Sequence, residues 1–290
     1  MKGMPMVSSS RRSFLKKAGM AASAGALPLS TALTHGGREG REKTPLPFGL
    51  GIASYTFRKF TLEQAIAMTK RAGIGKLALK DVHLPLTSSP QEIAAALAKM
   101  KSAGVTLSSC GVVYMKTEAE VERAFAYARS AGLKMIVGCP DMPLLAAAES
   151  AVRATDIALA IHNHGPADER FPSPESAYRA VAKMDKRMGL CIDVGHTQRL
   201  GLDPSAEAER FFDRLLDVHV KDVTAADATG SSVEIGRGVI DIPGLLKTLE
   251  RLKYTGTLHI EHEKDENDPL PGVAESAGYL RGVLDTLSLE

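Results

Sequence analysis

From Phe48 onward the chain repeats one unit, an apolar segment rich in β-forming residues followed by a turn and an amphipathic segment rich in Ala and Leu. The strand-like segments are 49–56, 76–80, 105–113, 133–138, 157–162, 190–194, 216–220 and 257–261, and the helical segments are 62–72, 91–103, 118–131, 144–155, 174–186, 204–214, 242–252 and 273–287. Strands that alternate with helices form parallel sheets, and eight such strands close into a barrel. The sequence therefore predicts an α/β fold, a single (β/α)8 barrel of the TIM type over residues 46–290.

An open, doubly wound parallel sheet is the alternative architecture for the same alternation. Such a sheet would carry a glycine-rich phosphate-binding loop after its first strand. The segment in that place is Ala53-Ser54-Tyr55-Thr56, which has no glycine. The closed barrel is therefore the favoured fold.

Residues 1–45 differ from the rest of the chain. Ser10-Arg11-Arg12-Ser13-Phe14-Leu15-Lys16 has the form of a twin-arginine signal, and a modest apolar stretch follows at 18–33, where Ser30-Thr31-Ala32 offers a cleavage site. A short amphipathic helix with paired arginines by chance is the alternative. We expect residues 1–45 to be a cleavable signal peptide and spacer, the twin-arginine export machinery to be a partner, and the mature protein to be periplasmic or otherwise exported.

The chain has a formal net charge of +2, but five of its positive charges and no acidic residue lie in the first 32 residues. Without that stretch the net charge is about −3, which offers no electrostatic footprint for nucleic acid. No later segment is long and apolar enough to span a membrane. We therefore expect neither a nucleic-acid partner nor a membrane anchor in the mature form.

The three cysteines, Cys110, Cys139 and Cys191, fall in three separate strand-like segments. An odd number spread in this way does not suggest a disulfide framework, so we expect packed thiols. The twin-arginine route exports proteins that are already folded, which fits both the lack of disulfides and a cofactor inserted before export.

Polar residues gather at the carboxyl ends of the strand-like segments, the side on which barrel enzymes place their sites. Strand alternation puts His162, Asp193, His219 and Glu261 on inward faces, 31, 26 and 42 residues apart, and each gap fits one advance of strand, loop, helix and loop. A single histidine is more often a packed or surface residue than a ligand, but four such groups in register predict one divalent metal site. Mixed nitrogen and oxygen ligands suit Mn²⁺, Zn²⁺, Co²⁺ or Fe²⁺ better than Ca²⁺.

Five motifs extend this pattern along the barrel: Ala160-Ile161-His162-Asn163-His164-Gly165, Ile192-Asp193-Val194-Gly195-His196, Val218-His219-Val220-Lys221-Asp222, Glu234-Ile235-Gly236-Arg237-Gly238 with Asp241, and His259-Ile260-Glu261. Together they resemble the sugar phosphate isomerase/epimerase group of the xylose isomerase-like barrel superfamily. That group includes ketose 3-epimerases, hydroxypyruvate isomerase, inosose dehydratase and, more distantly, endonuclease IV. The resemblance implies that Asp193, His219 and Glu261 bind a metal, and that His196 and Arg237 contact sugar oxygens.

The chain departs from the epimerases at His162, where they carry a glutamate that is both a metal ligand and one of two acid/base carboxylates. Glu261 remains as one such group. Lys80, His164 and Lys221 are the candidates for the missing one, and Lys221 is also a candidate substrate contact. Plainer roles remain open for all three: rim salt bridges for the lysines, and a hydrogen-bonded structural role for His164.

The leading functional hypothesis is a metal-dependent sugar isomerase or epimerase that removes a proton next to a carbonyl. A lyase or dehydratase of a keto-sugar or 3-keto-glycoside would use the same site. A non-catalytic sugar-binding barrel and an endonuclease IV-like hydrolase are less favoured, the latter because no basic groove is evident. The expected substrate is a small sugar or glycoside. In loop 165–174, Asp168 and Arg170 are either part of a substrate lid or solvated, and His83 either reaches the site or faces solvent.

Overall fold

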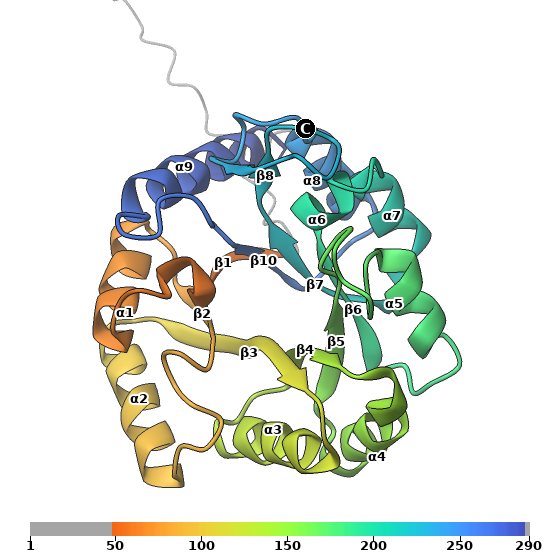
Figure 1. Cartoon of the computed structure of the whole chain (residues 1–290). Coiled ribbons are helices and arrows are strands. Elements are labelled where there is room, and N and C mark those ends of the chain that lie inside the picture. Colours follow the sequence, from red (N-terminus) through yellow and green to blue (C-terminus); the bar gives the residue numbers. More distant parts are fainter. Residues whose placement is uncertain (1–47, 288–290) are drawn as a thin grey trace, which may run out of the picture. The chain divides into compact units, whose positions relative to one another are not determined.

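The computed structural model describes residues 48–287 of the chain. At its centre eight parallel strands form a closed barrel, hydrogen-bonded in the order β1-β10-β7-β6-β5-β4-β3-β2 (Figure 1). The strands are β1 (Gly49–Ala53), β2 (Lys76–Leu79), β3 (Thr106–Met115), β4 (Met135–Pro140), β5 (Ala158–His162), β6 (Met188–Asp193), β7 (Leu215–Val220) and β10 (Thr257–Ile260). The predicted (β/α)8 barrel is confirmed.

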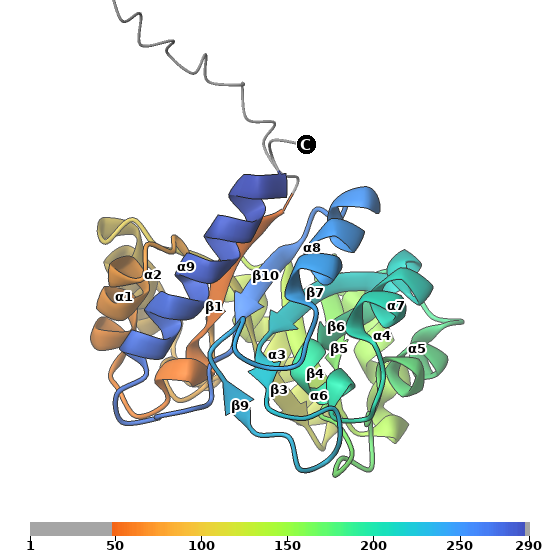
Figure 2. The same cartoon turned by 90° about the horizontal axis from the view of Figure 1, so that it is seen from above.

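Helices surround the barrel on its outside (Figures 1 and 2). They are α1 (Leu62–Arg71), α2 (Pro90–Ser102), α3 (Glu118–Ser130), α4 (Leu145–Thr155), α5 (Pro174–Val181), α7 (Pro204–Arg210), α8 (Ile242–Arg251) and α9 (Leu270–Leu287). Four of them begin with a capping box, in which a Ser or Thr side chain accepts a hydrogen bond from the third helical residue; the capping residues are Thr61, Ser89, Thr117 and Ser173. These local signals explain why the helix starts follow the sequence pattern closely.

Two predicted helices are shorter than expected. The segments 174–186 and 204–214 are helical only as far as Val181 and Arg210. The buried guanidinium of Arg214 donates hydrogen bonds to the carbonyl oxygens of Ala182, Met184, Asp185 and Met188. The chain after α5 is therefore held by one side chain rather than by helical hydrogen bonds.

The strand ends also differ from the prediction. The segment 49–56 is a strand only to Ala53, because the 3-10 helix η1 (Ser54–Phe57) turns the chain there. β3 continues to Met115, two residues beyond the predicted end, and this extension carries Tyr114 to the rim of the barrel. The helix α6 (Val194–Gln198) and a hairpin of β8 (Asp222–Val223) and β9 (Ser232–Val233) were not predicted.

The core fills the interior of the barrel and the space between the strands and the helices. The three cysteines are buried and free, so the expected packed thiols are confirmed. Gly51 of β1 leaves room for a neighbouring ring, because a side chain there would begin 2.6 Å from Cδ2 of His259.

The predicted signal segment, residues 1–45, lies outside the described residues. Between residues 48 and 287, no helix has both the length and the apolar character of a membrane span.

Candidate metal and substrate site

A cavity of about 300 Å³ lies at the carboxyl ends of the strands. It is lined by Tyr55, Lys80, Val112, Tyr114, His162, His164, His196, Glu261 and Glu263. These residues come from both halves of the barrel, and the polar ones follow the ends of β2, β5, β6 and β10. Barrel enzymes place their sites on this face.

Four neighbouring strands bring the predicted ligands together. His162 and Asp193 are the last residues of β5 and β6, His219 lies near the end of β7, and Glu261 directly follows β10. One ligand atom from each lies within 4.8 Å of the others, and none of the four residues is more than 5% exposed. The four residues that the sequence spacing predicts to meet therefore form one cluster in space.

The separations within this cluster suit a common ion. His162 Nε2 lies 3.1 Å from His219 Nδ1 and 3.5 Å from Asp193 Oδ2. His219 Nδ1 lies 3.3 Å from Glu261 Oε2. Ligand atoms about 2.0–2.2 Å from one ion stand about 3.3–3.6 Å apart at tetrahedral angles. Two imidazole nitrogens, one facing the other, share at most one hydrogen when both rings are neutral, so a cation satisfies this arrangement better than a proton does.

Lys221 shares the site with these four residues. Its ammonium lies 3.0 Å from Asp193 Oδ2, 2.9 Å from Glu261 Oε2 and 3.3 Å from Glu263 Oε1, and the side chain is 2% exposed. Burial disfavours the charged lysine, but Asp193, Glu261 and Glu263 outweigh it and hold the pKa of Lys221 well above its ordinary value. The three carboxylates thus favour the charged form of Lys221.

The charge of the site leaves room for a divalent cation. Three carboxylates face one ammonium, so with neutral imidazoles the cluster carries two uncompensated negative charges. Burial would lower the pKa of His219, but Glu261, Asp217 and Asp193 together outweigh burial and raise it. Burial would likewise raise the pKa of Glu261, yet Lys221 and then His219 hold it well below the ordinary range. The donor set therefore fits one divalent metal ion.

Asp193 is positioned from two sides. Its Oδ1 accepts a hydrogen bond of 2.8 Å from the backbone N–H of His196 and so caps α6, while Oδ2 points into the ligand cluster. The backbone N–H of Asp193 donates to Asn163 Oδ1 at 2.9 Å. These hydrogen bonds fix the orientation of the Asp193 carboxylate even without a bound ion, as the residues around a metal site commonly do for its ligands.

A second polar layer lies one step deeper in the barrel, two residues before the ligands on β7 and β10. Asp217 Oδ1 accepts a hydrogen bond of 2.9 Å from His259 Nδ1, and His259 Nε2 lies 2.7 Å from Ser108 Oγ. Asp217 Oδ2 is 3.9 Å from His219 Nε2. This layer supports His219 from below. The pairing of Asp217 with His259 explains why an aspartate and a histidine occur in the interior of the barrel.

On the rim above β3 and β5, Tyr114, His164 and Asp168 form a chain. Tyr114 Oη lies 2.8 Å from His164 Nε2, and His164 Nδ1 lies 3.2 Å from Asp168 Oδ2. Burial lowers the pKa of His164 and of His196 to about 4. Burial also raises the pKa of Tyr114 to about 12. His164, a candidate acid/base group from the sequence, is therefore in contact with a tyrosine that the sequence reasoning did not single out.

The remaining predicted residues differ in whether they reach the cavity. Lys80 lines the cavity, and its ammonium donates to the carbonyl of Val112 and lies 3.6 Å from Asp81. His196 also lines the cavity. His83 is buried and hydrogen-bonded to Ser54 and to the carbonyl of Phe57, so it reaches neither the cavity nor the solvent.

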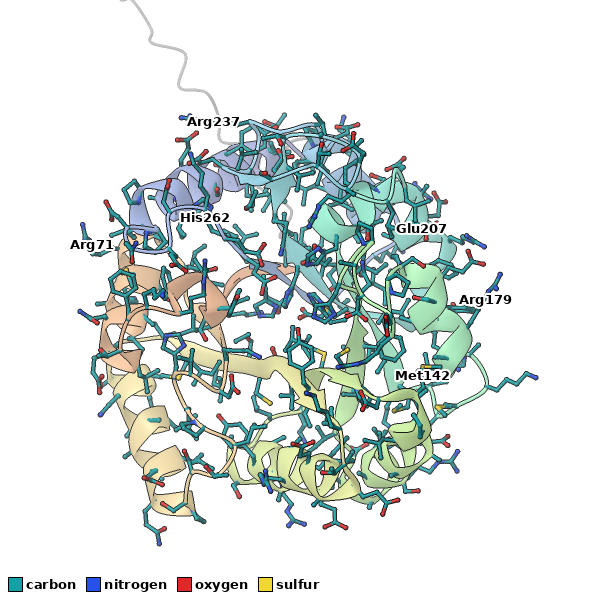
Figure 3. The ribbon with its side chains drawn as sticks, viewed as in Figure 1. Arg71, Met142, Arg179, Glu207, Arg237 and His262 are labelled. Carbon is teal, nitrogen blue, oxygen red and sulfur yellow. The ribbon has the colours of Figure 1, made fainter. Side chains whose placement is uncertain are left out.

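Arg237 is not brought to the cavity. Its guanidinium pairs with Glu275 of α9, and its side chain is 61% exposed at the outer edge of the barrel (Figure 3). The motif around it has a structural role instead, because Asp222 accepts hydrogen bonds from the backbone N–H groups of Gly236 and Gly238. A carboxylate that binds these two N–H groups fixes the loop and turns Arg237 away from the strand ends.

Tyr55, Tyr114 and Glu263 line the cavity but were not singled out as site residues from the sequence. Glu263 follows Glu261 at the spacing of one strand face, so that signal was present. Tyr114 lies beyond the predicted end of its strand, and Tyr55 lies in a 3-10 helix that the pattern assigned to a strand. The 3-10 turn brings Tyr55 to the cavity, and the continuation of β3 brings Tyr114 there.

Known proteins resemble this chain in sequence or in fold. MocC, a rhizopine catabolism protein of Rhizobium meliloti, is 31% identical over 139 residues, a match that spans 42% of either protein. A D-tagatose 3-epimerase-like protein superposes with a TM-score of 0.69 at 17% identity, over 83% of this chain and 98% of that one. The 3-keto-D-glucoside 4-epimerase YcjR of E. coli superposes with a TM-score of 0.66 at 15% identity, over 82% of this chain and 100% of that one. At these identities the two solved structures show a shared fold.

The sequence profile of one family matches most of the barrel. It covers residues 79–283, from the end of β2 into α9, and so includes all four members of the ligand cluster. Because the match extends over well over half of the chain, the protein belongs to the xylose isomerase-like TIM barrel family.

Proposed function

We propose that the protein is a divalent-metal-dependent isomerase or epimerase that removes a proton next to the carbonyl of a sugar. The single observation that carries the proposal is the cluster of His162, Asp193, His219 and Glu261, whose ligand atoms lie within 4.8 Å of one another beside a cavity that Glu261 also lines. The carbohydrate enzymes of the same family support the chemical class.

The four clustered side chains would hold the ion. When bound, it would supply a Lewis acid that polarises a substrate carbonyl and makes the hydrogen on the neighbouring carbon more acidic. Mixed nitrogen and oxygen ligands favour Mn²⁺, Zn²⁺, Co²⁺ or Fe²⁺.

Glu261 is the base in this proposal. The contacts described for its carboxylate all use Oε2, which leaves Oε1 to accept a proton from a substrate in the cavity. The ammonium of Lys221 lies 2.9 Å from Glu261 Oε2 and so helps to orient the base. The rings of His164 and His196, whose centroids are 6.0 Å apart, line the same cavity.

The expected substrate is an uncharged sugar or glycoside. The cations near the cavity are already engaged: Lys221 with three carboxylates, Lys80 with Asp81 and a carbonyl oxygen, and Arg170 with Asp141 at 3.0 Å. A phosphate would need a cluster of cations directed at it. The two tyrosines that line the cavity are 36% and 44% exposed, and their aromatic surface suits contact with a pyranose ring.

A lyase acting on a keto-sugar or 3-keto-glycoside is the second candidate. The two carboxylates that line the cavity, Glu261 and Glu263, both follow the end of β10 and reach the substrate from one side. Elimination needs only one base at the enolised carbon, whereas two-carboxylate epimerisation needs groups on both of its faces.

Export is a further part of the proposal. The twin-arginine motif at 10–16 would carry the folded, metal-loaded barrel out of the cytoplasm, and an extracytoplasmic enzyme meets free sugars and glycosides. Detection of the mature protein in a periplasmic fraction, and its retention in the cytoplasm when Arg11 and Arg12 are both replaced by Lys, tests this step.

The test of the function is incubation with ketopentoses, ketohexoses and 3-keto-glucosides in D₂O. Deuterium gained at the carbon next to the carbonyl without bond cleavage indicates the isomerase or epimerase, and released aglycone indicates the lyase. Chelator-treated protein is the control and should do neither. A metal-loaded protein that binds sugars but neither exchanges nor cleaves them would be a non-catalytic barrel and would refute the proposal.

A further inference from the structure

The proposed reaction lacks a group on the far side of the substrate. Glu261 and Glu263 follow the same strand, and Lys221, from the adjacent strand β7, is bound to both. An epimerase must remove a proton from one face of a carbon and return one to the other face. The missing group must therefore come from strands across the barrel mouth from β10.

Tyr114 occupies that position. It is the penultimate residue of β3, and around the barrel β3 is three strands from β10 in one direction and five in the other. Tyr114 lines the same cavity as Glu261, and it is 44% exposed. A substrate in the cavity would lie between these two residues.

The hydroxyl of Tyr114 is held in one place. Tyr114 Oη lies 2.8 Å from His164 Nε2, and the two rings stack with centroids 5.4 Å apart and planes 30° apart. His164 Nδ1 in turn lies 3.2 Å from Asp168 Oδ2. The other oxygen of Asp168 accepts hydrogen bonds from the backbone N–H groups of Arg170 and Phe171, at 2.6 and 3.2 Å, so the chain of three residues ends on a fixed anchor.

Two cations lie beside the phenol ring. Lys80 Nζ is 5.1 Å from its centroid, and the guanidinium carbon of Arg170 is 5.6 Å from it. Positive charges at this distance favour the phenolate that remains when a tyrosine gives up its proton. The burial that raises the pKa of Tyr114 keeps the proton on the hydroxyl until it is used.

We propose that Tyr114 is the second acid/base residue of the site and acts on the substrate face opposite Glu261, with His164 and Asp168 as its positioning residues. This inference rests on the proposed function and specifies it as an epimerase with one carboxylate and one phenol.

The step balances without a further reactant. The carboxylate of Glu261 takes the hydrogen from the carbon next to the carbonyl, and the C–H bonding electrons move into the enediolate. The O–H bond of Tyr114 then breaks as its proton forms a new C–H bond on the opposite face, leaving a phenolate. The phenolate gains a proton from water, since Tyr114 is exposed, and the carboxyl group of Glu261 loses one.

The test compares exchange with inversion in Tyr114→Phe, using the epimer whose hydrogen faces Glu261 in D₂O. We expect this variant to exchange that hydrogen at a rate within about threefold of the wild-type rate. It should form the opposite epimer at least about 100-fold more slowly, which is the loss typical of removing one acid/base group. Metal content should match the wild type, because the hydrogen bond and ring stacking of Tyr114 are with His164, which is not one of the four clustered residues.

Tyr55→Phe is the matched control, because Tyr55 is the other tyrosine that lines the cavity. We expect it to keep the wild-type ratio of exchange to inversion. A Tyr114→Phe enzyme that keeps that ratio, whether both rates fall together or neither falls, would overturn the inference. A wild-type enzyme that exchanges no hydrogen of any keto-sugar would instead refute the proposed function, so the two failures are distinguishable.

Discussion

The two halves of the barrel mouth differ in what they present to the cavity. The half built from β5, β6, β7 and β10 carries buried imidazoles, carboxylates and an ammonium, and the clustered ligands are at most 5% exposed. The half built from β1 to β4 presents Tyr55 and Tyr114, which are 36% and 44% exposed, together with Val112 and Lys80. One half is a fixed electrostatic centre, and the other is an open, largely aromatic surface.

This difference indicates a division of tasks. Charges that are buried together must stay in place, because an unpaired charge in the interior is costly. Aromatic rings at an open rim contact a ligand over a large area. We therefore expect changes in the first half to affect metal binding and stability, and changes in the second half to affect how the substrate is held and how its proton moves.

The largest effect is expected for Asp193→Asn, which removes one ligand charge and nearly preserves the shape. Metal catalysis contributes several kcal/mol, so loss of the ion should lower activity by about 1,000-fold or more. Elemental analysis of the purified variant should find less than a tenth of the wild-type metal. A variant that keeps both full metal content and activity would remove Asp193 from the site.

Lys221→Met should destabilise the metal-free protein by about 3–5 kcal/mol, because it leaves three carboxylates without their ammonium. Urea unfolding after chelator treatment measures this loss. Added metal should raise the melting temperature of this variant more than that of the wild type, since the ion then meets excess negative charge. Equal stability of the two metal-free proteins would contradict the buried ion network.

Acidification tests the neutral histidines of the same half. Burial lowers the pKa of His162 and of His196 to about 4, whereas in the unfolded chain such rings titrate near 6.5. As pH falls from 6.5 to 4, these rings therefore take up protons in the unfolded state but not in the folded state. Each ring should lower the free energy of unfolding of the metal-free protein by about 3 kcal/mol.

The raised pKa of His219 has the opposite sign, because its contribution is present below pH 6.5 and is lost as pH rises through the folded value. Urea midpoints between pH 4 and 8 measure the sum of these effects. His196→Asn should reduce the loss of stability at acid pH by the contribution of one ring. An unchanged loss in that variant would show that this ring is not held neutral.

The smallest effects are expected for Lys80 and Arg237. Lys80→Met should lower kcat about threefold, because it removes one of the two cations beside the phenol ring of Tyr114, and should leave the metal content nearly unchanged. A loss in kcat of about 100-fold or more would instead give Lys80 the acid/base role that the sequence also allowed. Arg237→Ala is the control at the outer edge of the barrel, and we expect less than a twofold change in kcat or KM.

The same division decides what the sequence could predict. His162, Asp193, His219 and Glu261 lie on regular strands, so periodicity and the spacing of one strand-helix unit were enough to bring them together. The barrel followed from the same periodicity. Tyr55 and Tyr114 depend on where a strand bends or continues, which is decided by tertiary hydrogen bonds rather than by local pattern. Arg237 was misleading for a related reason, because Asp222 fixes its loop through contacts 14 and 16 residues away.

The central claim is that one half of the mouth holds a single divalent ion. Anomalous diffraction from crystals grown with Mn²⁺ or Zn²⁺ tests it most directly. We expect one anomalous peak about 2.0–2.2 Å from His162 Nε2, Asp193 Oδ2, His219 Nδ1 and Glu261 Oε2, with the ammonium of Lys221 moved away from Asp193 Oδ2. No peak at saturating metal, with Lys221 still bridging Asp193 and Glu261, would contradict the account.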